Sequence, residues 1–317
     1  MASPRAARRL AAAALYGGGG LGLVGGGLVG LLKAEAKLAR HAIGMTSARP
    51  PSPDGTYGAD LPGTPIRLLV IGDSAAVGYG MIEAGDTPPA LMGHGLSELA
   101  GRPVEVRSRA VVGARSADLD GQIDRGSDPV PDVVSIVVGA NDVTHSVPPA
   151  QAVRSLDAAV RRLREMGCEV VVGTCPDLGT VRPLPQPLRL VAQTWSRRLA
   201  AAQTITVVEA GGRSVSLAGL LGRDFHSAPE ELFGADRFHP SLAGYASMVA
   251  AMLPSVAVAV DAWDEDEETA SYPAGTVLPV SFAAARAASV GGTEVARTHV
   301  AGDDRGPRGR WAALRRR

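Results

Sequence analysis

Four short stretches, far apart in the chain, carry the residue types that serine-dependent ester hydrolysis needs. They are Gly72-Asp73-Ser74, Gly113, Gly139-Ala140-Asn141-Asp142 and Asp236-Arg237-Phe238-His239-Pro240. A serine hydroxyl is a poor nucleophile until a base takes its proton, and a histidine oriented by a carboxylate is such a base. Hydrogen-bond donors must also face the oxygen that becomes negative. Each stretch alone is weak evidence, but the four together predict a hydrolase.

The histidine block has the spacing of an oriented base. His239 follows Asp236 by three residues and directly precedes Pro240. This spacing allows the Asp236 carboxylate to accept the imidazole Nδ1–H, which leaves Nε2 to take the proton from Ser74. An Asp-x-x-His pair arises easily by chance, and a turn serine alone is most often a structural cap. The prediction therefore depends on the two blocks occurring in one chain.

The two glycine-containing blocks offer donors for an oxyanion hole. Asn141 directly follows a predicted strand and can supply its side-chain amide. Gly113 lies on a predicted loop, where the lack of a side chain exposes its N–H, although a plain turn glycine is the alternative. The N–H of Ser74 would be the third donor. Each such donor is worth about 3–4 kcal/mol in the transition state.

Short apolar runs alternate with helical patterns along the middle of the chain, and they place these blocks. The predicted strands are residues 66–71, 104–107, 132–138, 169–174 and 205–208. Apolar residues recur at helical spacing over 153–166 and 188–199, and 241–253 is predicted as a helix that begins after Pro240. This order predicts a doubly wound parallel sheet, in which sites form at the carboxyl ends of the strands. The blocks fall at those ends.

Other residues near the blocks receive supporting interpretations. Asp73 and Asp142 are predicted to brace their loops by accepting backbone N–H groups. His145 is expected on the rim of the site. Residues 175–178 and the segment 81–92 are hypothesised to form walls of a substrate pocket.

Composition limits the function classes. The 317 residues carry 32 Lys+Arg and 32 Asp+Glu, so net charge gives no indication of a nucleic-acid partner. Cys168 and Cys175 lie at the two ends of one predicted strand, roughly 23 Å apart, which is too far for a disulfide. The six histidines are scattered, so the sequence predicts neither a metal nor a cofactor.

The chain divides into four predicted regions. Residues 1–44 form an N-terminal signal anchor or signal peptide, and 45–64 are a proline-rich linker. Residues 65–260 form the folded domain, and 261–317 are a disordered tail, acidic and then basic.

The uncharged segment Leu10–Leu32 is the predicted membrane contact. As a helix it would span about 35 Å, enough for a hydrocarbon core of about 30 Å. This length favours a membrane anchor with the folded domain outside the cytoplasm. The alternatives are a cleaved signal peptide, which would make the protein secreted, and a flexible glycine-rich leader. Three basic residues flank each side, so the positive-inside comparison is a tie.

Taken together, the four blocks resemble those of the SGNH hydrolases, also called GDSL-type esterases and lipases. The resemblance covers roughly residues 66–258, with all four motif letters in order. It implies Ser74 as nucleophile, His239 as base with Asp236 as its partner, and Ser74, Gly113 and Asn141 as oxyanion donors. It also implies a flavodoxin-like three-layer α/β/α domain around a parallel sheet of about five strands, and metal-independent hydrolysis of carboxylic esters.

The sequence departs from the family pattern at two positions. Ala75 stands where the family has leucine, and Ser108 stands where the second block often begins with asparagine. Neither position is catalytic, although Ser108 weakens the expected support of the Gly113 loop. Ala76 excludes the Gly-x-Ser-x-Gly elbow of the α/β-hydrolases.

Three alternative functions can be compared with these motifs. The ester substrate is a small molecule, a lipid or a glycan, so a carbohydrate O-deacetylase of the cell envelope is the alternative enzyme. A non-catalytic, membrane-tethered binding module would be expected to lack a catalytic group, and none is missing. Nucleotide binding near Gly72 lacks the Gly-Lys-Ser/Thr ending and the Gly-x-Gly-x-x-Gly fingerprint.

Overall fold

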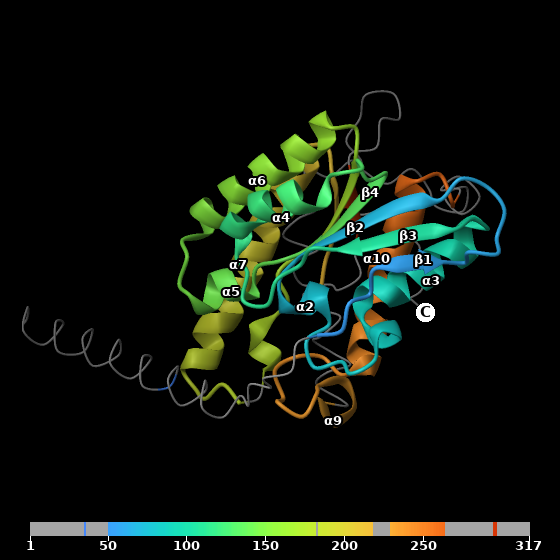
Figure 1. Cartoon of the computed structure of the whole chain (residues 1–317). Coiled ribbons are helices and arrows are strands. Elements are labelled where there is room, and N and C mark those ends of the chain that lie inside the picture. Colours follow the sequence, from blue (N-terminus) through green and yellow to red (C-terminus); the bar gives the residue numbers. More distant parts are fainter. Residues whose placement is uncertain (1–34, 36–49, 182, 218–228, 264–293, 297–317) are drawn as a thin grey trace, which may run out of the picture.

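A sheet with strand order β1-β3-β2-β4-β5-β6-β7 runs through the centre of the computed structural model (Figure 1). The structure describes residues 35, 50–181, 183–217, 229–263 and 294–296. The predicted membrane segment Leu10–Leu32 and most of the predicted tail lie outside these residues. The strands are β1 Gly55–Tyr57, β2 Ile66–Gly72, β3 Val104–Ser108, β4 Val133–Val137, β5 Glu169–Gly173, β6 Arg213–Val215 and β7 Glu294–Ala296.

The inner strands are parallel and the two outer pairs are antiparallel. β2 pairs with β3 and β4, β4 with β5, and β5 with β6, all in parallel. β1 adds antiparallel to β3, and β7 adds antiparallel to β6. The five inner strands confirm the predicted parallel sheet. β1 lies within the predicted linker and β7 within the predicted tail, so both of these regions contribute to the fold.

Helices cover both faces of the sheet, which confirms the three-layer α/β/α prediction. The α-helices are α2 Ser74–Val77, α3 Pro88–Ala100, α4 Leu119–Gly126, α5 Ala140–Thr144, α6 Pro149–Glu165, α7 Leu188–Glu209, α9 Pro229–Leu232 and α10 Leu242–Ala259. Short 3₁₀ turns occur at η1 Ala84–Asp86, η2 Ser116–Asp118 and η3 Leu178–Thr180. α4 and α6 lie over one face of the sheet and α3 and α10 over the other (Figure 1).

Two apolar cores, one on each face of the sheet, explain why the inner strands are continuous apolar runs in the sequence. In β2, Leu68 and Val70 pack into the core beneath α3 and α10, while Leu69 and Ile71 pack into the core beneath α4 and α6. All four side chains are buried. A strand covered on both faces needs apolar residues at every position, whereas a strand covered on one face alternates.

One predicted strand was wrong. Residues 205–208 form the end of α7, and the fifth parallel strand is Arg213–Val215. The buried residues Thr204, Val207 and Val208 continue the helical face of Leu199 and Ala200, so packing overrides the β-propensity of this run. The true strand has three residues and one apolar side chain, which is too weak a signal to recognise.

Among the described residues, α10 alone is long and apolar enough to cross a membrane. Half of it is buried, and it packs against α3 and β5. α10 is therefore a core helix of this domain by its contacts, and the predicted anchor at Leu10–Leu32 lies outside the described residues.

Candidate active site

Ser74 lies directly beyond the carboxyl end of β2, as the first residue of α2. Gly72 ends the strand with φ +134, and a Cβ there would lie 1.9 Å from the carbonyl oxygen of Val137. The N–H of Asp73 donates to that same carbonyl at 2.9 Å. The backbone at Gly72 therefore lies against the neighbouring strand β4 at a distance that only glycine allows, and this close contact sets the position of Ser74.

The Ser74 hydroxyl meets the predicted base. Nε2 of His239 lies 3.1 Å from Ser74 Oγ, and Nδ1 lies 2.6 Å from Asp236 Oδ2. The side chains of Asp236 and His239 are 13% and 11% exposed, so their interaction is largely shielded from water. The structure thus brings the three residues of the predicted triad into one hydrogen-bonded row.

The loop that carries His239 is folded by its own hydrogen bonds. Asp236 Oδ1 accepts the N–H groups of Phe238 and His239, both at 2.9 Å. The N–H of Gly234 donates to the His239 carbonyl at 2.8 Å. Burial raises the pKa of the Asp236 carboxyl, but the bonds from the His239 side chain and these N–H groups outweigh it, so the pKa lies below its ordinary value. Asp236 is therefore a carboxylate at neutral pH.

Aromatic rings enclose the imidazole of His239. The Tyr79 ring lies 4.4 Å from it, centre to centre, and the Phe238 ring lies 4.9 Å away in an edge arrangement. Tyr245, a fully buried residue of α10, donates its hydroxyl to the Tyr79 carbonyl at 2.9 Å. Sequence reasoning missed both tyrosines, because nothing in their spacing relates them to the histidine block.

The predicted oxyanion donors Asn141 and Gly113 lie in α5 and on the loop after β3, at the same end of the sheet as α2. Asn141 Nδ2 donates to the Ala114 carbonyl at 3.1 Å, which joins the start of α5 to the loop that carries Gly113. Gly113 has φ +83, a conformation that favours glycine. Among the described residues, the N–H groups of Ser74 and Gly113 make no hydrogen bond. Both are therefore available to a ligand.

Two buried carboxyl groups brace these turns, as predicted. Asp73 accepts the N–H of Ala75 at 2.9 Å, and Asp142 accepts the N–H and the hydroxyl of Ser116 at 3.0 and 2.9 Å. Burial raises the pKa of Asp73 to about 7, despite its bonds to backbone N–H groups. Burial also raises the pKa of Asp142, against the lowering effect of Ser116.

Two buried glutamines hold the strand ends in place, and sequence reasoning missed them. Gln122 of α4 accepts the N–H of Gly72 at 2.7 Å and donates to its carbonyl at 2.9 Å. Gln203 of α7 accepts the N–H of Cys175 at 2.7 Å and donates to the Val138 carbonyl at 3.0 Å. A glutamine on the inward face of an amphipathic helix was the available signal, because a buried amide needs partners.

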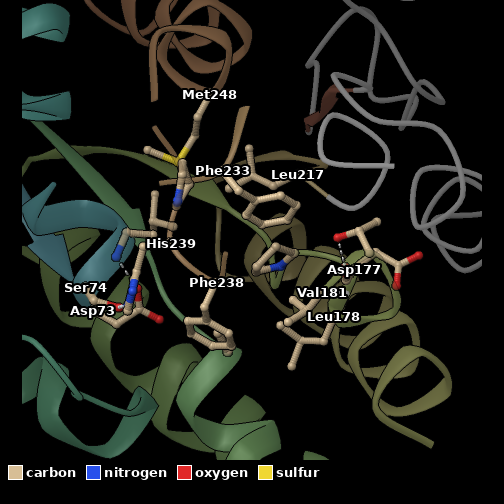
Figure 2. Close-up of a pocket in the computed structure, with 16 residues that line it drawn as sticks. Asp73, Ser74, Asp177, Leu178, Val181, Leu217, Phe233, Phe238, His239 and Met248 are labelled. Carbon is tan, nitrogen blue, oxygen red and sulfur yellow. Dashed lines mark hydrogen bonds between the residues drawn. The ribbon is translucent and has the colours of Figure 1, made fainter. Parts of the chain in front are cut away.

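A cavity of about 660 Å³, including space open to solvent, adjoins Ser74 and His239. Figure 2 shows these two residues on one side and Leu178 and Val181 across from them. The lining is mostly apolar and includes Leu178, Val181, Leu217, Phe233, Phe238 and Met248.

Of the other residues predicted near the pocket, some line the cavity and others do not. Pro176, Asp177 and Leu178 line the cavity, but Cys175 is buried beneath it, and burial raises the pKa of its thiol well above the ordinary value. No residue of the segment 81–92 lines this cavity. His145 is exposed, with Nδ1 2.9 Å from the Asn141 carbonyl. Within the described ranges, no three His, Cys, Asp or Glu side chains are arranged to hold a metal ion.

Residues 70–247 match the GDSL-like lipase/acylhydrolase family, which is more than half of the chain. The chain belongs to this family. It is 42% identical to the GDSL-like esterase Rv1075c of Mycobacterium tuberculosis over 229 residues, which cover 68% of this chain and 72% of the relative. As a member of the GDSL family, the protein is a carboxylic ester hydrolase.

A solved structure of an acetylxylan esterase shares the fold. A catalytic mutant of Axe2, an acetylxylan esterase from Geobacillus stearothermophilus, superposes with a TM-score of 0.50 at 19% identity. The match covers 61% of this chain and 95% of that chain. At this identity the likeness concerns the α/β fold alone, and the substrate of this chain must be argued from its own site.

Proposed function

We propose that this chain cleaves carboxylic esters through a covalent acyl-enzyme at Ser74. Ser74 Oγ attacks the ester carbonyl carbon while its proton moves to Nε2 of His239, 3.1 Å away. The Asp236 carboxylate, 2.6 Å from Nδ1, stabilises the imidazolium that forms. The imidazolium then gives the proton to the alkoxide oxygen as the carbon–oxygen bond breaks. The observation that carries this proposal is the hydrogen-bonded row of the three side chains.

Deacylation uses the same groups. A water molecule attacks the acyl carbon and gives a proton to Nε2 of His239, and that proton returns to Ser74 Oγ when the acid leaves. In both halves of the reaction the carbonyl oxygen carries negative charge. The unpaired N–H groups of Ser74 and Gly113 and the amide of Asn141 are the proposed donors to that oxygen.

The cavity supports an ester whose group beside Ser74 is uncharged and apolar. Its wall is mainly Leu178, Val181, Phe233 and Met248, which give a sugar hydroxyl no polar partner. A carbohydrate O-deacetylase remains the rival, since an acetyl group is itself apolar and a glycan could lie outside the cavity. A series of p-nitrophenyl esters of rising chain length, compared with acetylated sugars, separates these substrates.

The test of the nucleophile is covalent labelling by a fluorophosphonate probe, which modifies serines activated by a base. We expect labelling of the native chain and its complete loss in Ser74→Ala. Ser247→Ala is the matched control, because that hydroxyl donates only to the Ala243 carbonyl on the surface of α10. Labelling that survives in Ser74→Ala, or an unlabelled native chain, contradicts the proposal.

We also propose that Leu10–Leu32 anchors the enzyme, with the hydrolase domain outside the cytoplasm. The support is the uncharged length of this segment. The full chain should then stay with membranes after alkaline extraction, and protease added to intact cells should cleave the domain. Release of an intact domain into the medium would instead indicate a cleaved signal peptide.

A further inference from the structure

One wall of the cavity is a short turn that depends on a neighbouring helix. Asp177 caps η3, and its Oδ1 accepts the N–H of Gly179 at 2.8 Å. Leu178, Thr180 and Val181 of this turn line the cavity. In Figure 2, Leu178 and Val181 lie across the cavity from the Ser74–His239 pair. The position of this turn therefore sets the width available to a bound group.

One face of α7 holds the turn through three polar residues. Arg197 donates its Nε–H to Asp177 Oδ2 at 2.8 Å and forms an ion pair with that oxygen, with Nη2 also 2.8 Å away. Gln193 Nε2 lies 3.5 Å from the same oxygen. Ser196 accepts the N–H of Leu178 at 3.2 Å. Positions 193, 196 and 197 share one side of the helix because they are three and four residues apart.

The ion pair joins a buried group to an accessible one. The Asp177 side chain is 3% exposed, whereas that of Arg197 is 49% exposed. A buried carboxylate needs charged or N–H partners, and removal of its cationic partner leaves an uncompensated charge. The carboxylate would then turn toward water and draw η3 with it, because Asp177 is also the cap of that turn.

We propose that Arg197 is a positioning residue for ester specificity: through Asp177 it holds Leu178 and Val181 where they limit the size of the apolar group that enters the cavity. This inference rests on the proposed ester hydrolysis at Ser74. Arg197 itself does not line the cavity and is not in contact with Ser74 or His239. Arg197 therefore affects which esters fit into the cavity.

The catalytic end of the sheet has separate support. Gln203, nearer the end of α7, holds the ends of β4 and β5 through hydrogen bonds to Val138 and Cys175. Gln122 holds Gly72 from α4. Loss of the Arg197–Asp177 pair thus moves η3 while the hydrogen bonds of Gln203 and Gln122 remain. Ester selectivity and the activation of Ser74 can therefore be measured separately.

The experiment compares Arg197→Gln with Arg198→Gln in the full chain. Arg198 is the adjacent, exposed residue of α7, and it has no ion pair or hydrogen bond among the described residues. For each variant, kcat and KM are measured with p-nitrophenyl acetate, butyrate and octanoate. We expect the octanoate-to-acetate ratio of kcat/KM to rise about tenfold in Arg197→Gln. The change should fall mainly on the KM for octanoate, and Arg198→Gln should keep the native ratio.

Two further variants keep the test decisive. Arg197→Lys retains the charge without the planar fork and should restore the native ratio in part. Leu178→Ala shortens the wall directly and should raise the ratio in the same direction as Arg197→Gln. An unchanged ratio in Arg197→Gln, in a chain with the native urea midpoint, overturns the positioning role. If the native chain hydrolyses none of the esters and resists the fluorophosphonate, the proposed function fails as well.

Discussion

The turn that carries Ser74 and the loop that carries His239 come within 3.1 Å of each other, but they are held in different ways. The Ser74 turn is tied to the centre of the sheet, through the Val137 carbonyl and the Gln122 amide. The His239 loop is tied mainly to itself, through the Asp236 carboxylate and the Gly234 N–H. The position of Ser74 is thus set by tertiary contacts, whereas the position of His239 is set by hydrogen bonds within its own loop.

This difference predicts which substitutions alter folding and which alter only the chemistry. A change at Gly72 disturbs the pairing of β2 with β4, so stability and activity should fall together. A change of the orienting carboxylate on the base side leaves the sheet intact, so activity falls alone.

Asp236→Asn should give the largest effect on activity. The asparagine amide can keep the backbone bonds of the loop but favours the wrong imidazole tautomer, and we expect kcat to fall about 10⁴-fold. The urea midpoint should change little. Asp60→Asn, at an exposed aspartate, is the control and should leave both quantities at native values. A kcat within about tenfold of native would mean that Asp236 does not orient the base.

Gly72→Ala should give the largest effect on stability. The new Cβ would fall 1.9 Å from the Val137 carbonyl oxygen at φ +134, so the turn must move. We expect the free energy of unfolding to drop by about 4 kcal/mol or more, or the chain to fail to fold. Gly55→Ala in β1 is the matched control, because a Cβ there meets nothing within 4 Å. Urea denaturation measures the free energy of unfolding of both variants. Equal losses in the two would contradict the special role of the close contact between Gly72 and Val137.

Asp73→Asn should change the pH dependence of stability. Burial raises the pKa of Asp73 from 3.8 to about 7 in the folded chain. Its contribution to stability is therefore complete below about pH 4 and is lost as the pH rises through about 7. Relative to the variant, the native chain should lose at most about 1.4 kcal/mol per pH unit between these limits. Urea titrations from pH 4 to 8 test this, and parallel pH profiles of the two proteins would contradict it.

The sequence indicated the inner strands β2 to β5 and the catalytic blocks because both depend on local signals. Apolar runs mark strands buried on two faces. Asp236 lies near His239 in the chain, so one short motif contains the proposed base and its proposed partner. The clamps of Gln122 and Gln203 join residues 50 and 28 positions apart. No local pattern in the sequence indicates such distant partners. For the same reason, the sequence predicted a pocket wall at residues 175–178 but not the contacts with α7 that support it.

The two outer strands have a consequence for handling the hydrolase domain. β1 and β7 satisfy the backbone groups at the edges of β3 and β6, and Glu294 of β7 also binds Ser255 and Arg213 at 2.7 and 2.9 Å. A chain trimmed to residues 60–260 would lose both strands and present two open sheet edges. Open edges pair with those of other molecules, so aggregation of such a fragment would reflect missing edge strands and not an unstable core.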